Sequence, residues 1–284
     1  MYRYGIQCAL TQWSERVPAV FRGSLDEVCA ASRKAGYDGV ELYFGNPEVY
    51  DAKEFVRVAE RYGLAYTGIC TGPEKLLYNL CLTDDDPVVR QKAVDRLKTH
   101  LDFAAVLDCP VVVGTMRGNI PEKAALNSYL DRLSEALTQL NSYAETTGGT
   151  VLVENILQYI SNYLNSAEEV GAYLRRLDLP RVKLHIDTHS MHMEDAEPYD
   201  AVRKYGDILG YVHFSDSHRG YPGSGVIDFK AYYHALLDAN YTGWIVSECQ
   251  PFPTAMDCAV QGLENMKNWE QQVRASACAG KVEK

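Results

Sequence analysis

The sequence of 284 residues contains no long apolar stretch. Its apolar runs, such as CPVVVG at residues 109–114, are far shorter than the roughly 20 residues that a membrane-spanning helix needs. The opening segment, MYRYGIQCALTQWSERVPAV, has neither the apolar core nor the small-residue cleavage pattern of a signal peptide. We therefore expect neither a membrane partner nor a secretory leader.

Paired cysteine motifs are also missing. The eight cysteines form no Cys-x-x-Cys pair and are scattered along the chain, unlike those of a small disulfide-stabilised protein. Several lie within apolar runs, where a reduced cysteine packs as a small hydrophobic residue. A reducing, cytoplasmic environment is the expected location.

Positive charge is scarce. The chain has 28 Lys and Arg against 38 Asp and Glu, which gives a formal net charge of −10. Proteins that bind nucleic acid need a basic surface for the phosphates, so we expect no nucleic-acid partner. The negative net charge does not exclude a small anionic ligand, because a few local arginines suffice to bind it. The apolar fraction of 46% is ordinary for a globular protein with a sizeable core.

Short β-branched or apolar runs alternate with longer amphipathic segments along the whole chain. The strand-like runs cover residues 3–10, 38–44, 64–70, 109–116, 150–155, 182–188, 209–215 and 244–249. The helix-like segments cover residues 24–37, 51–63, 87–108, 123–148, 166–177, 199–206, 229–240 and 254–273. Ser24 and Ser166 precede acidic first turns, as helix N-caps do.

Eight strands alternating with helices are typical of a (β/α)8 TIM barrel, which commonly takes about 250 residues. A doubly wound open sheet is the alternative, but no Gly-x-Gly-x-x-Gly motif follows the first strand-like run. We predict the α/β class, with one (β/α)8 barrel domain at residues 1–276 and a flexible tail at residues 277–284.

Acidic or imidazole side chains end four consecutive strand-like runs. Glu154 closes TVLVEN, Asp187 closes VKLHIDT, His213 lies near the end of LGYVHFS and Glu248 closes WIVSEC. Catalytic groups of such barrels lie at the C-terminal strand ends, so we expect these side chains to converge at the barrel mouth. Clustered carboxylates repel one another, and a divalent cation removes that conflict. An oxygen-rich set with one imidazole suits Mn²⁺, Mg²⁺, Co²⁺ or Zn²⁺, although each residue alone is also typical of a hydrogen-bonded rim residue.

Longer phrases carry a family resemblance. GYDGVEL, VLVEN, HIDT, LGYVHFSDSHRGYPGSGVIDF and WIVSE resemble the xylose-isomerase-like TIM barrels known as sugar phosphate isomerases/epimerases, and within these the D-tagatose/D-psicose (ketose) 3-epimerase group. The resemblance implies that Glu154, Asp187, His213 and Glu248 hold one divalent metal ion, with Mn²⁺ expected. It also implies that Glu154 and Glu248 act as acid and base, and that Arg219 contacts the substrate.

This resemblance implies an isomerase that acts on a small-molecule sugar. A ketose would chelate the cation through its carbonyl oxygen and an adjacent hydroxyl, which acidifies the neighbouring C–H. One glutamate would remove that proton to give an enediolate, and the other would return a proton on the opposite face. Relatives of this kind often form homo-oligomers, which makes self-association a further expectation.

The sequence departs from the group's pattern in one place. Members usually carry Asp-Thr-Phe-His, whereas this chain has Asp187, Thr188, His189 and Ser190 in that order. Ser190 stands where a substrate-contacting histidine belongs and His189 lies one position early, so both are candidate substrate contacts. A dehydratase or lyase on a sugar-derived substrate, inosose dehydratase-like or C-glycoside-cleaving, is therefore the alternative in the same barrel. An endonuclease-IV-like nuclease is less well supported, because no histidine ends the third and fourth strand-like runs and the charge is −10.

Three further candidates lie near or just beyond the ends of early strand-like runs. Arg117 comes after the fourth run, at the end of the barrel where a substrate would lie, and Trp13 follows the first run, where it could cover the apolar face of a sugar. Glu41, near the end of the second run, could contact substrate or pair with a neighbour.

Two residues are candidates for the shell around the metal ligands. Asp216 could accept a hydrogen bond from a ligand histidine or could cap its own loop. His185 shares a strand face with Asp187 but lies deeper, as a hydrogen-bonded core histidine would.

Overall fold

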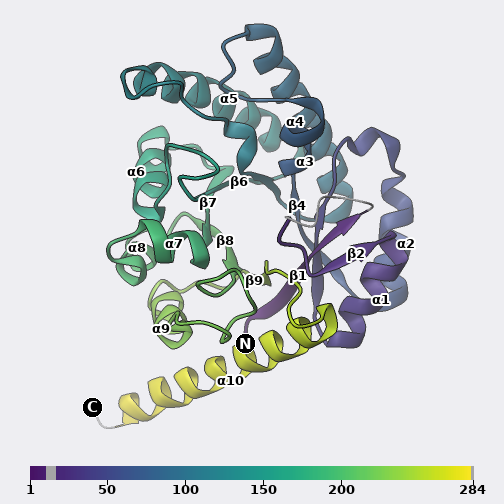
Figure 1. Cartoon of the computed structure of the whole chain (residues 1–284), viewed down its shortest axis with the longest axis vertical. Coiled ribbons are helices and arrows are strands. Elements are labelled where there is room, and N and C mark those ends of the chain that lie inside the picture. The colour runs from purple at the N-terminus through teal and green to yellow at the C-terminus, as the bar shows by residue number, and fades with distance from the viewer. Residues whose placement is uncertain (11–16, 283–284) are drawn as a thin grey trace.

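Eight parallel strands close into a barrel in the computed structural model, which describes residues 1–10 and 17–282 and, for residues 278–282, the backbone alone (Figure 1). The barrel strands are β1 (Arg3–Leu10), β3 (Gly39–Tyr43), β4 (Ala65–Cys70), β5 (Val111–Val113), β6 (Val151–Glu154), β7 (Val182–Asp187), β8 (Leu209–Phe214) and β9 (Trp244–Ser247). Each pairs with the next in this order, and pairing of β1 with β9 closes the ring. The predicted fold class and all eight predicted strands are confirmed.

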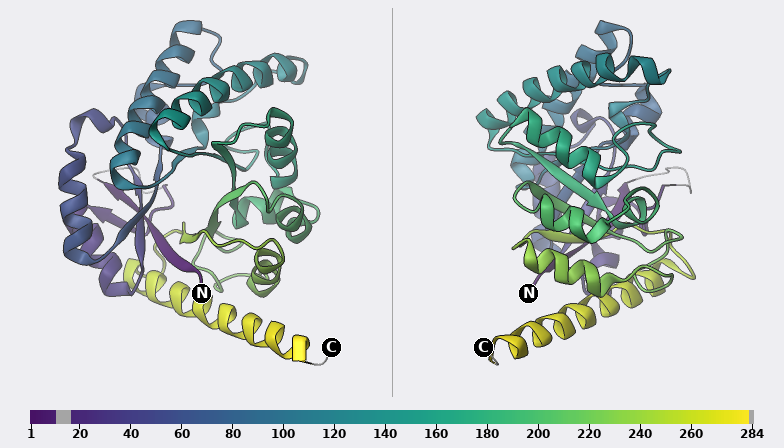
Figure 2. Two further views of the ribbon diagram at one scale, coloured as in Figure 1. Left: turned by 180° about the vertical axis from the view of Figure 1, so that it is seen from behind. Right: turned by 90° about the vertical axis from the view of Figure 1, so that its left-hand side faces the viewer.

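The barrel is surrounded by helices (Figures 1 and 2). They are α1 (Leu25–Ala35), α2 (Ala52–Tyr62), α3 (Gly72–Tyr78), α4 (Pro87–Leu107), α5 (Leu126–Thr147), α6 (Ala167–Leu177), α7 (Thr188–Glu194), α8 (Pro198–Lys204), α9 (Phe229–Asp238) and α10 (Ala255–Val282). Short 3-10 turns are η1 (Pro47–Val49), η2 (Thr115–Arg117) and η3 (Lys123–Ala125). Ser24 and Ser166 cap α1 and α6 in full capping boxes with Glu27 and Glu169, as the acidic first turns indicate.

Three elements were not expected from the sequence. Strand β2 (Phe21–Gly23) pairs in parallel with the end of β1, outside the ring, and three residues are too few to show a periodic pattern. Helices α3 and α7 are two-turn helices that begin directly behind β4 and β7. Helix α10 continues to Val282 and so extends into the segment that we expected to be a tail from residue 277 onward, and the flexibility of that segment and the domain boundary at residue 276 stay predictions.

Side chains of the strands alternate between two apolar layers. One layer packs between the barrel and the helices, with Ile6, Leu42 and Val212 as members. The other fills the barrel itself, where Leu152, Tyr211 and Val246 belong to one cluster. Because side chains two residues apart share a face, these three lie below Glu154, His213 and Glu248 on the inward face of their strands. The apolar barrel interior therefore supports a polar layer at its C-terminal end.

No helix in residues 1–10 and 17–282 has the length and apolar character to cross a bilayer. The seven cysteines whose side chains the structure describes are all buried and unpaired, as reduced core cysteines are. The cytoplasmic location stays a prediction.

A buried carboxylate anchors α3 to the rest of the barrel. The side chain of Glu74 is fully buried and accepts hydrogen bonds from the backbone N–H of Asn46 at 2.7 Å, from His100 Nε2 at 2.7 Å and from Arg96 Nη1 at 2.8 Å. Burial alone would raise the pKa of Glu74, but His100 and Arg96 outweigh it, so the pKa lies below its ordinary value of 4.5.

We predict that Glu74→Gln lowers the free energy of unfolding by about 3–5 kcal/mol at pH 7, because it leaves Arg96 without its charged partner. Folding lowers the pKa of Glu74, so its stabilisation is complete above about pH 4.5 and is lost as the pH falls below that value. Urea unfolding of both proteins between pH 7 and pH 3.5 should therefore show a difference in the free energy of unfolding that becomes smaller on acidification. Glu60→Gln, at an exposed position of α2, is the matched control. A difference in the free energy of unfolding that is small at pH 7, or that does not depend on pH, would contradict this account.

Candidate active site

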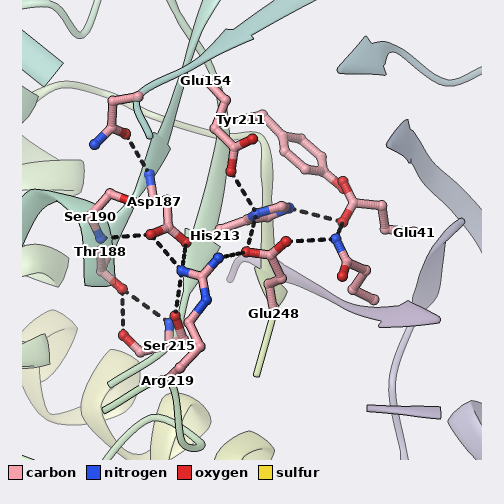
Figure 3. A network of polar contacts seen from close by, with 12 residues as sticks. Glu41, Glu154, Asp187, Thr188, Ser190, Tyr211, His213, Ser215, Arg219 and Glu248 are labelled. Atoms are coloured by element: carbon pink, nitrogen blue, oxygen red, sulfur yellow. Dashed lines mark hydrogen bonds and ion pairs between the residues drawn. The ribbon is translucent and has the colours of Figure 1, made fainter. Parts of the chain in front are cut away.

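The structure brings the four predicted metal-ligand residues together at the C-terminal end of the barrel (Figure 3). Each of Glu154, Asp187, His213 and Glu248 is buried and offers one ligand atom, and these atoms all lie within 4.8 Å of one another. The strand register explains the convergence, since Asp187 pairs with His213 across β7 and β8, and Glu248 directly follows β9. Four side chains from four consecutive strands thus meet at one point.

Asp187 is held by the elements on either side of it. Its backbone N–H donates to Asn155 Oδ1 at 2.8 Å, and its carboxylate Oδ1 accepts from the N–H of Ser190 at 2.7 Å, as the N-cap of α7. Asp187 is therefore both the last residue of β7 and the N-cap of α7, and its side chain folds back over the first turn of that helix. This leaves the second carboxylate oxygen of Asp187 directed at the cluster (Figure 3).

The imidazole of His213 is oriented by a buried carboxylate from the opposite wall. Its Nε2 lies 2.9 Å from Glu41 Oε2, and its Nδ1 lies 3.3 Å from Glu248 and 3.7 Å from Glu154. Gln7 connects the carboxylate of Glu41 to that of Glu248, because its Nε2 donates to Glu41 Oε2 at 2.9 Å and to Glu248 Oε1 at 2.8 Å. The proton on Nε2 is thereby fixed, which directs Nδ1 into the cluster.

These donors fit a divalent cation. Nδ1 of His213 is a buried nitrogen that makes no hydrogen bond of ordinary geometry, and it points at two carboxylates. Although burial opposes protonation, Glu41 and Glu248 raise the pKa of His213 well above its usual range. The imidazolium therefore supplies positive charge to the cluster, and a cation that took the Nδ1 lone pair would release this proton.

Arg219 completes the charge balance of the cluster. Its Nη1 lies 2.7 and 2.6 Å from the two oxygens of Asp187, and its Nη2 bonds to Glu248. Burial would raise the pKa of Glu248, but Arg219 and His213 hold it at about 2. Among the described residues no arginine forms an ion pair with Glu154, and burial raises its pKa to about 7, opposed by His213. The two glutamates thus differ in pKa because they differ in neighbours.

A cavity of about 560 Å³ opens above the cluster. Its wall includes Glu154, Arg219 and Glu248, together with Ser190, which stands at the position of the family's usual histidine, and His189, which lies one position earlier. His189 Nδ1 lies 3.2 Å from the carbonyl oxygen of Asp216, which positions its ring. Both predicted substrate contacts on α7 therefore line the space next to the predicted ligands.

The structure decides between the two alternatives given for Asp216 and corrects the expectation that His185 is hydrogen-bonded. The carboxylate of Asp216 does not contact a ligand histidine; it accepts backbone N–H groups of Ser217, Gly223 and Ile227 at 2.7, 2.8 and 3.1 Å. It caps its own loop, because the chain turns away from the barrel axis after β8. His185 is buried, but its ring nitrogens make no hydrogen bond to the described residues. Its ring instead packs edge-on against His213, with centroids 4.1 Å apart.

Arg117 does not line the cavity, contrary to its predicted role. The side chain is fully buried, its guanidinium makes no hydrogen bond to the described residues, and it lies over the ring of Tyr163 at 5.7 Å. The η2 turn, which follows β5, directs this side chain behind the cavity wall. Burial lowers its pKa accordingly. Trp13, the remaining candidate, lies outside the described residues.

Gln7 was not recognised as a site residue from the sequence, and for Glu41 the structure shows the second of its two alternatives, pairing with a neighbour, which is His213. Both are fully buried polar side chains within barrel strands β3 and β1. The signal for Glu41 was its position near the end of a strand-like run, the same signal that identified the four ligands. Gln7 gave no such signal, because an amide in the middle of a strand is compatible with many environments.

The model of the xylose isomerase-like TIM barrel family matches residues 29–275. The chain belongs to this family. Among curated proteins, it is 28% identical to the ketose 3-epimerase of Arthrobacter globiformis, over 76% of this chain and 74% of that protein. It is 29% identical to the D-psicose 3-epimerase of Enterocloster bolteae, over 95% and 88%. It is 27% identical to the 3-dehydro-D-guloside 4-epimerase of Escherichia coli, over 76% and 83%.

Solved structures show the same barrel. The D-allulose 3-epimerase of a Methylomonas species, in complex with D-allulose, superposes with a TM-score of 0.80 over 94% of this chain and 96% of that one, at 24% identity. An L-ribulose 3-epimerase gives a TM-score of 0.81 over 98% and 97%, at 23% identity. The predicted resemblance to ketose 3-epimerases is confirmed, and these curated relatives are enzymes of the isomerase class.

We predict that Glu41→Gln weakens the binding of Mn²⁺ by about 10- to 100-fold, because loss of the carboxylate frees the ring of His213 to turn or change tautomer. Titration calorimetry with MnCl₂ measures the affinity directly. Tyr211→Phe removes a hydroxyl that bonds to Thr67 and leaves the Glu41 contact intact, so it should bind Mn²⁺ as the unmodified protein does. Equal affinities for Glu41→Gln and the unmodified protein would exclude an orienting role.

Proposed function

We propose that the protein is a divalent-metal-dependent sugar epimerase that inverts the carbon next to the carbonyl of a ketose, C3 being the favoured position. Glu154 and Glu248 are its acid/base pair. The observation that carries the proposal is that both carboxylates line one cavity and lie close to the same ring nitrogen of His213, Nδ1, although Glu154 ends β6 and Glu248 directly follows β9. Figure 3 shows them approaching His213 from two sides.

The metal centre that we propose consists of Glu154, Asp187, His213 and Glu248, with Mn²⁺ as the ion. When bound, such an ion polarises a carbonyl oxygen and stabilises the negative charge that develops as the neighbouring carbon loses its proton. The donor set of three carboxylates and one imidazole, without thiolate, suits Mn²⁺.

Inversion of a carbon requires one group to remove a proton from one face and another to deliver a proton to the opposite face. Two glutamates on different strands meet that requirement, whereas a single carboxylate would return the proton to the face it came from. His213 and Arg219 hold Glu248 in place, and Gln7 bonds to it from the third side. Arg219, His189 and Ser190 supply polar contacts for the hydroxyl groups of the substrate.

Ser190 is the feature that favours a second candidate function. It lines the cavity at the position of the family's usual histidine, so one substrate contact of the ketose 3-epimerases is shortened here. A dehydratase or lyase begins with the same proton removal and then expels a leaving group instead of taking a proton back. Product analysis separates these outcomes, because only epimerisation leaves the composition of the sugar unchanged. The expected absence of nucleic-acid binding and the expected homo-oligomer stay predictions.

We predict that Glu154→Gln and Glu248→Gln each lower the rate at which the epimer appears by about 10²-fold or more, because inversion needs both proton-transfer groups. The Mn²⁺-loaded protein is incubated with a panel of ketoses, and NMR follows deuterium at each carbon and the appearance of the epimer. Glu264→Gln, at an exposed position on α10, is the matched control. Calorimetry with Mn²⁺ on each variant shows how far a loss of rate reflects a loss of metal.

Deuterium at C3 together with a new diastereomer is the expected result. Deuterium at C1 with an aldose product would assign aldose–ketose isomerisation instead. Near-normal rates in either glutamine variant would contradict the acid/base assignment.

A further inference from the structure

The imidazole of His185 lies inside the barrel without a hydrogen bond. The side chain is fully buried, and neither ring nitrogen has a partner among the residues that the structure describes. Two rings pack edge-on against it instead, that of His213 at a centroid distance of 4.1 Å and that of Tyr211 at 5.0 Å. Buried polar groups are nearly always hydrogen-bonded, so an exception at a candidate active site needs a physical explanation.

The strand register places His185 directly beside Glu154. These two residues are partners across β6 and β7, just as Asp187 and His213 are partners across β7 and β8. His185 and Asp187 stand two residues apart on β7, so both side chains face the inside of the barrel. His185 is the deeper of the two, and it is not part of the cavity wall.

Three possible ligand atoms converge at this deeper level. One atom each from Glu154, His185 and His213 lie within 4.8 Å of one another, and all three side chains are buried. This second set shares Glu154 and His213 with the four-residue set described above. It has the imidazole of His185 in place of the carboxylates of Asp187 and Glu248.

The two sets favour different ions. Three carboxylates and one imidazole form an oxygen-rich set that suits Mn²⁺, whereas imidazole nitrogen suits Zn²⁺, Fe²⁺, Ni²⁺ and Cu²⁺. Two histidines and one glutamate, with a coordination position left open, are a known ligand set of Zn²⁺. A neutral imidazole offers one lone pair, because only one of its two nitrogens carries the proton. No donor of the described residues uses that lone pair in His185.

We propose that Glu154, His185 and His213 form a second metal position, which takes a divalent ion that prefers imidazole, with Zn²⁺ as its representative. This position overlaps the proposed Mn²⁺ centre. Nε2 of His213 lies 2.9 Å from Glu41, so Nδ1 is the nitrogen that either ion would bind. One lone pair binds one ion, and the two positions are therefore alternatives. The inference goes beyond the proposed function, because it concerns which ion the barrel holds and does not require that any sugar is epimerised.

X-ray absorption at the zinc edge tests the ligand set directly. We expect the protein with one molar equivalent of Zn²⁺ to show two imidazole ligands besides oxygen, and His185→Phe to show one. Phenylalanine keeps a ring between Tyr211 and His213 and removes both nitrogens. A single imidazole in the unmodified protein would place the ion in the oxygen-rich set, and a sulfur ligand would place it at a cysteine. Either result would overturn the inference without any variant.

Affinities show whether the two sets are separate. Zn²⁺ binds most nitrogen and oxygen sites more tightly than Mn²⁺ does, so a difference between the two ions alone decides nothing. We expect His185→Phe to weaken Zn²⁺ binding by at least about 100-fold, since even loss of an outer-shell partner costs about 10- to 100-fold. It should leave the Mn²⁺ affinity unchanged. Asp187→Asn should do the reverse and weaken Mn²⁺ binding more than Zn²⁺ binding, because Asp187 belongs only to the oxygen-rich set.

Titration calorimetry with ZnCl₂ and MnCl₂ measures these affinities. His234→Phe, at an exposed position of α9, is the matched control, because it removes a surface imidazole and should change neither affinity. An unchanged Zn²⁺ affinity in His185→Phe would show that the ring serves packing or binds a water molecule, and would overturn the inference. Equal losses of Zn²⁺ and Mn²⁺ affinity in this variant would also overturn it, because one set would then serve both ions.

Competition between the ions tests the overlap of the two positions. Zn²⁺ added to the Mn²⁺-loaded protein should release Mn²⁺ one for one, which EPR detects as the signal of the free ion. Release from His185→Phe should need at least about 100-fold more Zn²⁺, in proportion to its lost affinity. Simultaneous binding of both ions would overturn the overlap. Absence of deuterium uptake in every ketose would instead count against the proposed function, and the zinc ligand count would still decide this inference.

Discussion

Three carboxylates and an imidazole are gathered within 4.8 Å at a buried point, and their mutual electrostatics is the constraint on which the site depends. Buried like charges repel strongly, because the protein interior screens them far less than water does. Two cations offset this repulsion. They are Arg219, which bonds to Asp187 and Glu248, and the imidazolium of His213. Burial raises the pKa of Glu154, and the negative charge of Glu248 adds to this shift, while His213 opposes it.

The surrounding residues follow from this constraint. A cluster of charges keeps its geometry only if each member is held from outside, and Glu41, Gln7 and Asn155 do this through hydrogen bonds. Each holding residue lies on or directly beside a barrel strand, so the closed sheet supplies rigidity that loops would not. Below the cluster, the apolar barrel interior excludes water, which strengthens every one of these interactions.

The parts of the molecule that depend on strand periodicity were predictable from the sequence. Each of the eight barrel strands appears where an apolar run does, and Glu154, Asp187 and Glu248 meet because each stands at the end of its run. A parallel barrel converts position along a strand into position in space, so no long-range information was needed. Glu41 obeys the same rule, but its buried ion pair with His213 depends on two strands that lie apart in sequence.

Predictions for residues beyond the strand ends had mixed outcomes, for a physical reason. Arg117 and Asp216 leave the barrel on turns, where one change of backbone direction decides whether a side chain faces the cavity or the protein behind it. Helices α3 and α7 were not predicted from the sequence, because a helix of two turns is too short to show an amphipathic period. Composition does not reveal such turns, and tertiary contacts of the kind made by Glu74 fix them.

The same difference between strand ends and turns is present in the candidate site. Residues at strand ends belong to the cavity wall, and their types resemble those of a family whose relatives are named as epimerases of several sugars. Residues of α3 and of the segment behind β6 line the same cavity, where the chain can change without disturbing the barrel. Ser190, on α7, lines it too, and the N-cap bond that Asp187 accepts from its backbone N–H does not depend on its side chain. The residues around a bound ligand can therefore diverge in this barrel while the proposed proton-transfer pair and its supports stay the same.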